Sequence, residues 1–163
     1  MEIKLQQNDT IISKTDTSGK ITYVNKGFVT ISEFDEVQLI GQPHNILRHQ
    51  AMPKAIFSYL WSTITAGDAM FAYVVNKTAQ DNYYWVLAHI TPITDDTGEI
   101  CAYQSLRRKA NPLALEIIKP IYQKMLDIEK SEDVEASLAY LSELLESENS
   151  DYNSFINMLQ TQR

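Results

Sequence analysis

The chain has 163 residues, of which 44% are hydrophobic and 21% are charged, and its formal net charge is −7. This length and composition suit one globular domain with an apolar core, and the single cysteine excludes an internal disulfide and any site with several thiolate ligands. No apolar run approaches the roughly 18 residues that cross a bilayer and no secretory signal opens the chain, so we expect a cytoplasmic protein without direct membrane insertion.

The N-terminal part predicts a hairpin that is followed by short helices. Residues 11–16 and 20–24 have strand character, with apolar and polar side chains alternating in the second run, and an Asp…Gly turn joins them as in a pair of antiparallel strands. Within residues 25–41 the apolar side chains recur at helical spacing instead. We expect short helices there, with Ser32 and Asp35 as N-caps.

A firmer helix and three strands come next. Residues 52–66 open with Met-Pro, carry apolar residues along one face and end before a glycine. Residues 69–77, 83–91 and 100–107 are rich in β-branched and aromatic residues, and polar turns separate them. Two strands, a helical block and three strands predict an α+β fold: a five-stranded antiparallel sheet with short helices on one face.

The rest of the chain has a helical pattern throughout. Residues 112–128 form an apolar stripe that contains Pro120, so we expect a kink or a break at that proline. Residues 133–161 carry a second stripe and a last short amphipathic helix. The chain therefore divides into a domain at residues 1–110 and a C-terminal helical extension at residues 111–163.

Most of the negative charge lies in that extension. Residues 131–163, the acidic tail, hold seven acidic residues and one basic residue, whereas residues 1–130 hold 14 acidic and 13 basic residues. A nucleic-acid partner requires a basic face, which this distribution does not supply. The one basic cluster, Arg107-Arg108-Lys109, ends a predicted strand, and we interpret it as a solvated strand edge.

One segment resembles a known family. Residues 41–53 read Gly-Gln-Pro-His-Asn-Ile-Leu-Arg-His-Gln-Ala-Met-Pro, which is similar to the GQPHN…RH..MP signature of the PAS domains of aerotaxis (energy-taxis) receptors. Further matches keep the order, among them Asn-Asp-Thr-Ile-Ile at 8–12, Tyr-Trp-Val at 84–86 and Lys-Pro-Ile-Tyr at 119–122. The chain resembles most the free-standing PAS subunit of a bipartite energy-taxis system.

This resemblance implies a PAS fold with FAD held non-covalently between the sheet and the helical block, where its redox state reports electron-transport activity. It also implies that the state passes through the C-terminal helices to a membrane-bound chemotaxis-type signalling protein, and a homodimer is possible. Arg48 and His49 are the first candidates carried over from the family. Asn76 is a further one, since an inward amide in a strand needs a partner. The cofactor-binding candidates are Arg48, His49, Asn45, Asn76, Trp61, Met70 and Trp85.

Some of these residues have a second interpretation. Trp61 and Trp85 are as compatible with plain core as with a pocket wall, and Asn45, like its neighbour His44, can serve to order a loop. The chain also departs from the family signature at two positions: Ala51 stands where the family has an acidic residue, and Met70 stands where it commonly has tryptophan.

Other function classes receive less support. Haem would need an axial histidine in the 52–66 helix, and the three histidines lie elsewhere. A cysteinyl flavin photosensor would need a cysteine in the helical block, whereas Cys101 is in a late strand. The chain has no phosphate loop, nucleophile motif or metal-ligand spacing, so we do not expect an enzyme. The alternative left open is a cofactor-free adaptor, whose acidic helices pack on the sheet, dimerise or dock on a partner.

Overall fold

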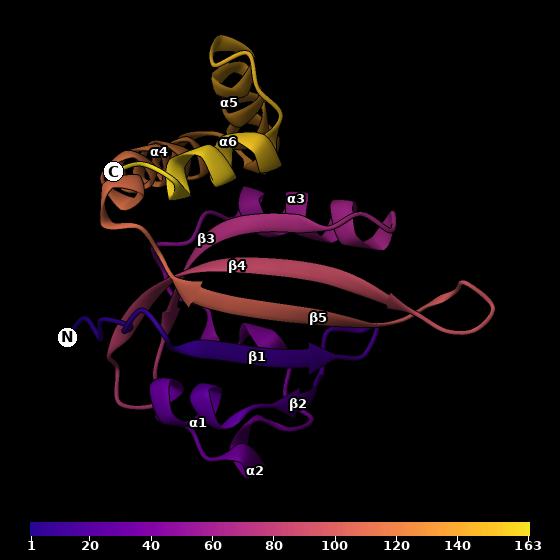
Figure 1. Ribbon diagram of the computed structural model, residues 1–163. Helices are drawn as coiled ribbons and strands as arrows, with labels where there is room; N and C mark the ends of the chain where they lie inside the picture. The colour runs from indigo at the N-terminus through magenta and orange to yellow at the C-terminus, as the bar shows by residue number, and fades with distance from the viewer.

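The computed structural model describes residues 1–163 and is built around a five-stranded antiparallel sheet (Figure 1). The strands are β1 (Thr10–Thr15), β2 (Ile21–Val24), β3 (Met70–Lys77), β4 (Tyr83–Thr94) and β5 (Ile100–Lys109). Their spatial order is β2-β1-β5-β4-β3, so the N-terminal hairpin pairs with the last strand. All five predicted strands are confirmed. β4 and β5 run past their predicted ends, and β3 forms one edge of the sheet.

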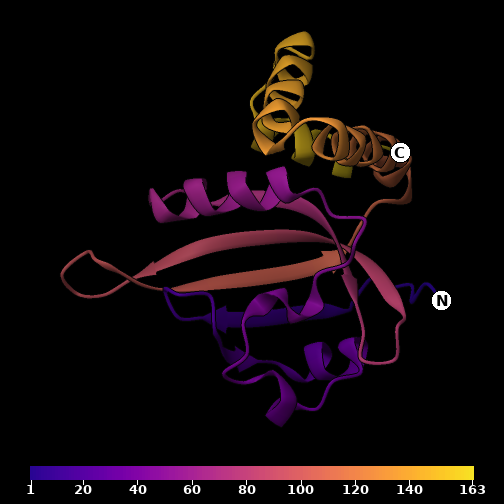
Figure 2. The same cartoon turned by 180° about the vertical axis from the view of Figure 1, so that it is seen from behind.

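Four short helices lie on one face of this sheet, as predicted (Figure 2). They are α1 (Lys26–Ser32), α2 (Glu36–Leu39), the 3-10 helix η1 (His44–Leu47) and α3 (Lys54–Thr65). Asp35 is the N-cap of α2 and belongs to a capping box, as expected. The prediction that Ser32 is an N-cap is wrong: Ser32 is the buried last residue of α1, and Asn25 caps that helix by accepting a hydrogen bond from the backbone N–H of Phe28.

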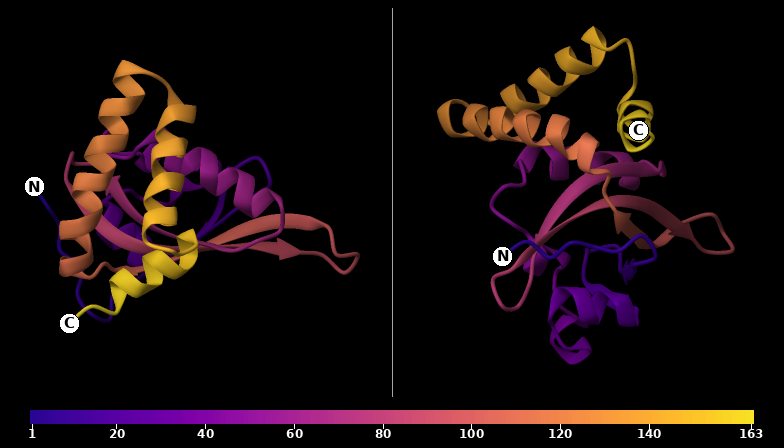
Figure 3. Two further views of the ribbon diagram at one scale, coloured as in Figure 1. Left: turned by 90° about the horizontal axis from the view of Figure 1, so that it is seen from above. Right: turned by 60° about the vertical axis from the view of Figure 1, so that its left-hand side comes forward.

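The remaining three helices pack at the β3 edge of the sheet and against α3 (Figures 1 and 3). They are α4 (Pro112–Ser131), α5 (Val134–Ser147) and α6 (Tyr152–Gln160). The break that Pro120 predicted is absent, since α4 runs through it as one helix. Pro120 has no N–H to donate to the carbonyl of Glu116, but both residues are on the exposed face of α4. The buried face of the helix packs continuously past this point.

The core has a larger and a smaller cluster of buried side chains. The larger cluster joins β3, β4 and α3 to the C-terminal helices through residues such as Ile118, Met125 and Phe155, whereas the smaller one joins β1 and β2 to α1 and α2. Both apolar stripes of the extension therefore pack within the chain, the first with buried residues such as Ile118 and Met125 and the second with the buried Leu141 and partly buried neighbours. None of the helices combines the length and the apolar character that a bilayer crossing requires.

Candidate functional site

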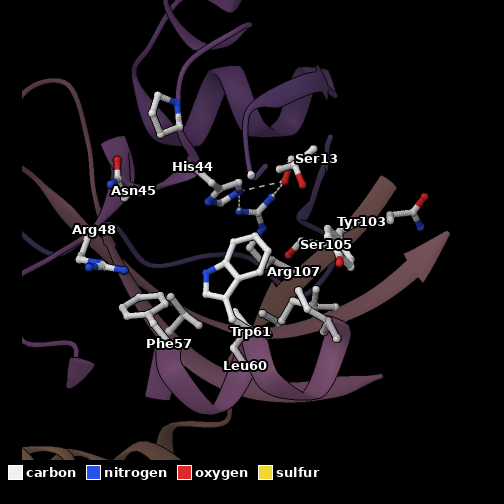
Figure 4. A pocket seen from close by; sticks show the side chains of 18 of the residues that line it. Ser13, His44, Asn45, Arg48, Phe57, Leu60, Trp61, Tyr103, Ser105 and Arg107 are labelled. Atoms are coloured by element: carbon white, nitrogen blue, oxygen red, sulfur yellow. Dashed lines mark hydrogen bonds between the residues drawn. The ribbon is translucent and has the colours of Figure 1, made fainter. Parts of the chain in front are cut away.

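A cavity of about 370 Å³ separates the inner face of the sheet from α3 and η1 (Figure 4). Its volume falls within the range of about 300–1,000 Å³ that is typical of small-molecule sites. One wall is aromatic and aliphatic, with Phe57, Leu60 and Trp61 projecting from the inner face of α3. The opposite wall is the sheet, where the small side chain of Ala88 in β4 leaves room.

Arg107 is the least expected residue of this cavity. Inward-facing side chains alternate along β5, so Tyr103, Ser105 and Arg107 share the cavity side, while Arg108 is exposed. Arg107 is only 2% exposed. The interpretation of the basic cluster as a solvated edge is therefore wrong for Arg107. Because successive side chains of a strand point to opposite faces, the predicted strand already implied that one of the two adjacent arginines points inward.

The guanidinium of Arg107 lies within a small polar group. Its Nη2 donates a hydrogen bond to Oγ of Ser13 in β1, and its Nη1 lies 3.2 Å from Nε2 of His44 in η1. The group also lies 4.8 Å from the ring centroid of Phe28 in α1. Figure 4 shows the indole of Trp61 projecting from α3 into the same cavity. Three segments of the N-terminal part, β1, α1 and η1, thus hold a positive charge that comes from β5, the last strand.

The charge in the cavity has no carboxylate to balance it. Arg107 and Arg48 both line the cavity, and none of its twenty lining residues is acidic. Desolvation by burial lowers the pKa of Arg107 to about 10. Its Nε and the Nδ2 of Asn76, a residue only 5% exposed, are buried and have no hydrogen-bond partner. Because buried donors are normally satisfied, this arrangement favours a ligand with acceptor atoms or negative charge.

His44 is held neutral in this setting. Burial, and secondarily the charge of Arg107, lower its pKa from 6.5 to about 3. Its Nε2 lies 3.1 Å from Oγ of Ser13, so one neutral ring nitrogen contacts both partners of the polar group. The sequence alone allowed His44 to be a residue that only orders its loop. In the structure His44 lines the cavity.

We expect His44 to make the folded state acid-sensitive. Between pH 6.5 and pH 3 the unfolded chain protonates this histidine and the folded chain does not, so stability falls as the pH drops, by at most about 1.4 kcal/mol per pH unit. Urea unfolding at pH 7 and pH 5 should show a smaller loss for His44→Gln than for the unchanged chain. Equal losses would mean that His44 takes up its proton in the folded state.

Four of the seven candidates line the cavity. They are Asn45, Arg48, Trp61 and Asn76. Arg48 lies at the exposed end of the site, and its guanidinium is 4.0 Å from the ring centroid of Phe57, a cation–π arrangement. Trp61 is partly exposed and packs edge-on against Tyr103. The structure therefore brings together a cation, an amide and an aromatic ring from separate elements.

The other three candidates lie elsewhere. The ring of His49 packs 5.5 Å from that of Tyr83, and its Nδ1 accepts a hydrogen bond from the N–H of Ala51. Trp85 points to the opposite side of the sheet, where its ring is 6.1 Å from that of Tyr122 in α4, because strand alternation places it out of phase with Ala88. Met70 is fully buried at the start of β3 and does not line the cavity.

Comparison with known proteins agrees with this architecture. The family model described as PAS domain matches residues 8–106. The aerotaxis receptor of Escherichia coli (strain K12) is 35% identical over 121 residues, which cover 74% of this chain and 24% of the receptor. The nitrogen fixation regulatory protein of Klebsiella pneumoniae is 27% identical over 104 residues, or 64% of this chain and 21% of that protein.

Among solved structures, the light-state structure of the blue-light photoreceptor Aureochrome1 LOV is similar in fold, with a TM-score of 0.57 and 21% identity over 77% of this chain and 92% of that one. The chain spans about a quarter or less of the curated relatives that it matches. The segment that matches the family model contains β1 to β4, most of β5 and the helices that enclose the cavity, and it ends one residue before Arg107. By sequence and by fold, this chain belongs to the PAS domain family, as its 41–53 segment predicted.

Proposed function

We propose that this PAS chain is a cytoplasmic redox sensor, which binds FAD non-covalently in the cavity and relays its redox state to a membrane-bound chemotaxis-type signalling protein. The PAS family and the 35% identity to an aerotaxis receptor support a sensory role. The observation that carries the proposal is the cavity itself. Its apolar walls enclose the buried Arg107, and no carboxylate lines the cavity to balance that charge.

The lining residues fit the parts of a flavin. An isoalloxazine ring is flat, with apolar faces and acceptor atoms along its edge, and the bound flavin supplies reversible redox chemistry. The side chains of Leu60 and Trp61 offer apolar surfaces for the faces. Arg107 and Asn76 offer unused donors for the edge, and the exposed Arg48 offers a cation for a phosphate group. The donor set therefore matches an acceptor-rich, anionic ligand.

The contacts of the C-terminal helices support a relay of signal away from the cavity. They contact α3 and β3, and both of these elements also line the cavity. A relay requires that the lining residues interact differently with the two redox states of the ligand, because a ligand shifts a conformational equilibrium only by its differential affinity. We propose that the partner binds the α4–α6 unit and responds to its position.

Flavin content and a matched pair of variants test this function. We expect the purified chain to be yellow or to take up added FAD, and Arg48→Ala to bind FAD at least about tenfold more weakly, since a hydrogen bond to a charged group contributes about 1.5–3 kcal/mol. His49→Ala, outside the cavity, should bind as the unchanged chain does. Fluorescence titration measures both affinities. A colourless chain that takes up no FAD would support the cofactor-free adaptor instead.

A further inference from the structure

The helix that forms the cavity wall receives its N-terminal cap from the C-terminal extension. Glu129 of α4 accepts two backbone hydrogen bonds at the start of α3, from Lys54 N–H to Oε2 and from Ala55 N–H to Oε1, both at 2.9 Å. A carboxylate in this position stabilises a helix N-terminus through its unpaired N–H groups and its dipole. These two contacts join residues that are more than 70 positions apart in the sequence.

No residue of α3 itself performs this task. The N-cap of α3 is Pro53, which makes no side-chain cap hydrogen bond, and its first turn contains no acidic residue. By contrast, α1, α4, α5 and α6 are each capped by the side chain that immediately precedes them. Glu129 therefore fills a role that the α3 segment leaves open.

Both elements that the extension holds are walls of the cavity. Four side chains of α3 line it, and β3 adds Val74 and Asn76 from its inner face. On the outer side of β3, the hydroxyl of Tyr122 donates to the carbonyl of Tyr73 at 2.6 Å. Asn153 in α6 accepts from Phe71 N–H and donates to the carbonyl of Ala69. The extension thus holds β3 along its free edge and α3 at its N-terminus.

The contact with α3 is the one that is most sensitive to a small shift. The hydrogen bonds to β3 attach to a strand whose other edge is fixed by β4, whereas α3 is a single helix over the cavity. Hydrogen bonds weaken steeply with distance and angle, while apolar contacts tolerate small displacements. A movement of α3 that accompanies ligand binding would change the Glu129 contacts before it changes the rest of the interface.

Resting on the proposed function, we infer that Glu129 couples ligand occupancy of the cavity to the docking of α4–α6. The capped position of α3 keeps Phe57 and Trp61 at the cavity and is the position that binds ligand. Since coupling between two sites is reciprocal, loss of the cap must weaken ligand binding by the same factor by which ligand strengthens docking. Glu129 is a positioning residue: it does not contact the ligand and affects binding only through the position of α3.

The experiment compares Glu129→Gln with Glu116→Gln in the full chain. Glu116 is on the same helix and is exposed, and it does not accept the hydrogen bonds from the start of α3, so its substitution removes the same charge without touching the cap. FAD is the probe. We expect Glu129→Gln to bind it at least about fivefold more weakly, the lower end of typical coupling, and Glu116→Gln to bind it as the unchanged chain does. Circular dichroism checks that both variants remain folded.

Hydrogen exchange separates coupling from a purely structural role. In the unchanged chain, FAD should slow exchange at the amides of Lys54 and Ala55 and throughout α4–α6, and in Glu129→Gln the slowing in α4–α6 should disappear. A variant that melts earlier but keeps its affinity and its FAD-dependent exchange would overturn the coupling and leave the proposed function standing. If the unchanged chain takes up no FAD, the proposed function and this coupling both fall.

Discussion

Replacing Arg107 by methionine should abolish flavin binding and, in the same variant, make the ligand-free chain more stable. Arg107 is 2% exposed, no carboxylate lines its cavity, and its Nε has no hydrogen-bond partner. Burying a charge that is not paired costs free energy, and hydrophobic replacement of buried charges often stabilises a protein by about 1–4 kcal/mol. Methionine keeps much of the side-chain length and fills the space flexibly.

The two effects have opposite signs because the site is built for a ligand that the empty chain lacks. The hydrogen bond of Arg107 to Ser13 and its contact with Phe28 offset part of the burial cost, so we expect a gain of about 1–2 kcal/mol in urea unfolding. FAD titration of the same preparation should show no saturable binding. The stability gain should disappear when saturating FAD is present, because only the unchanged chain is stabilised by it.

Arg108→Met is the matched control for this experiment. Arg108 is the next residue of β5, but it is exposed and does not line the cavity. Its substitution should leave stability within about 0.5 kcal/mol and flavin affinity unchanged. If Arg107→Met were instead less stable than Arg108→Met and bound FAD normally, then Arg107 would be a structural residue and the cavity would not be the flavin site.

The sequence predicted the fold because the local signals all indicate the same elements. Strand alternation, turn residues and the helix N-cap at Asp35 each depend on neighbouring residues and are visible in a window of a few positions. Two local signals misled. Ser32 is the last residue of α1 and not an N-cap. Pro120 does not break α4, because a proline on an exposed helix face costs one hydrogen bond and the buried face of the helix continues through it.

The site was less accessible to such reasoning, since it depends on which face each strand residue takes. Asn76 could be predicted to point inward from its strand position. The direction of Trp85 depends on which residues of β4 face the cavity, and β4 is apolar on both faces, so its sequence does not show this. His49 and Arg48 are adjacent in a loop, where no periodicity assigns a direction, and only Arg48 lines the cavity. The cap of α3 by Glu129 is a long-range contact that no local pattern contains.

Gly27→Ala should destabilise the fold and disturb the cavity through a displacement of α1. A Cβ at Gly27 would lie 2.3 Å from the backbone oxygen of Thr10 in β1, a distance that real Cβ atoms do not adopt. That oxygen also accepts a hydrogen bond at 3.0 Å from Nδ2 of Asn25, the cap of α1. The methyl group must therefore push α1 away from the sheet and weaken a hydrogen bond that ties the start of α1 to the strand.

The displacement would reach the ligand site through the next residue. Phe28 is fully buried, and its ring lies 4.8 Å from the guanidinium of Arg107 and 6.2 Å from the ring of His44. Overpacking against a backbone atom costs about 3 kcal/mol, and the better helix propensity of alanine returns up to about 1 kcal/mol. We therefore expect a net loss of about 2 kcal/mol in urea unfolding, with weaker FAD binding at temperatures where the variant is folded.

Thr30→Ala on the exposed face of α1 is the control, and it should leave both quantities unchanged. Comparison of Gly27→Ala with Thr30→Ala tests whether α1 is held against β1 by the close backbone approach that only glycine permits. Equal stability of the two variants would show that α1 can move away from β1 at no cost. Phe28 would then be free to shift, and it could not be the rigid support that holds Arg107 in place for a ligand.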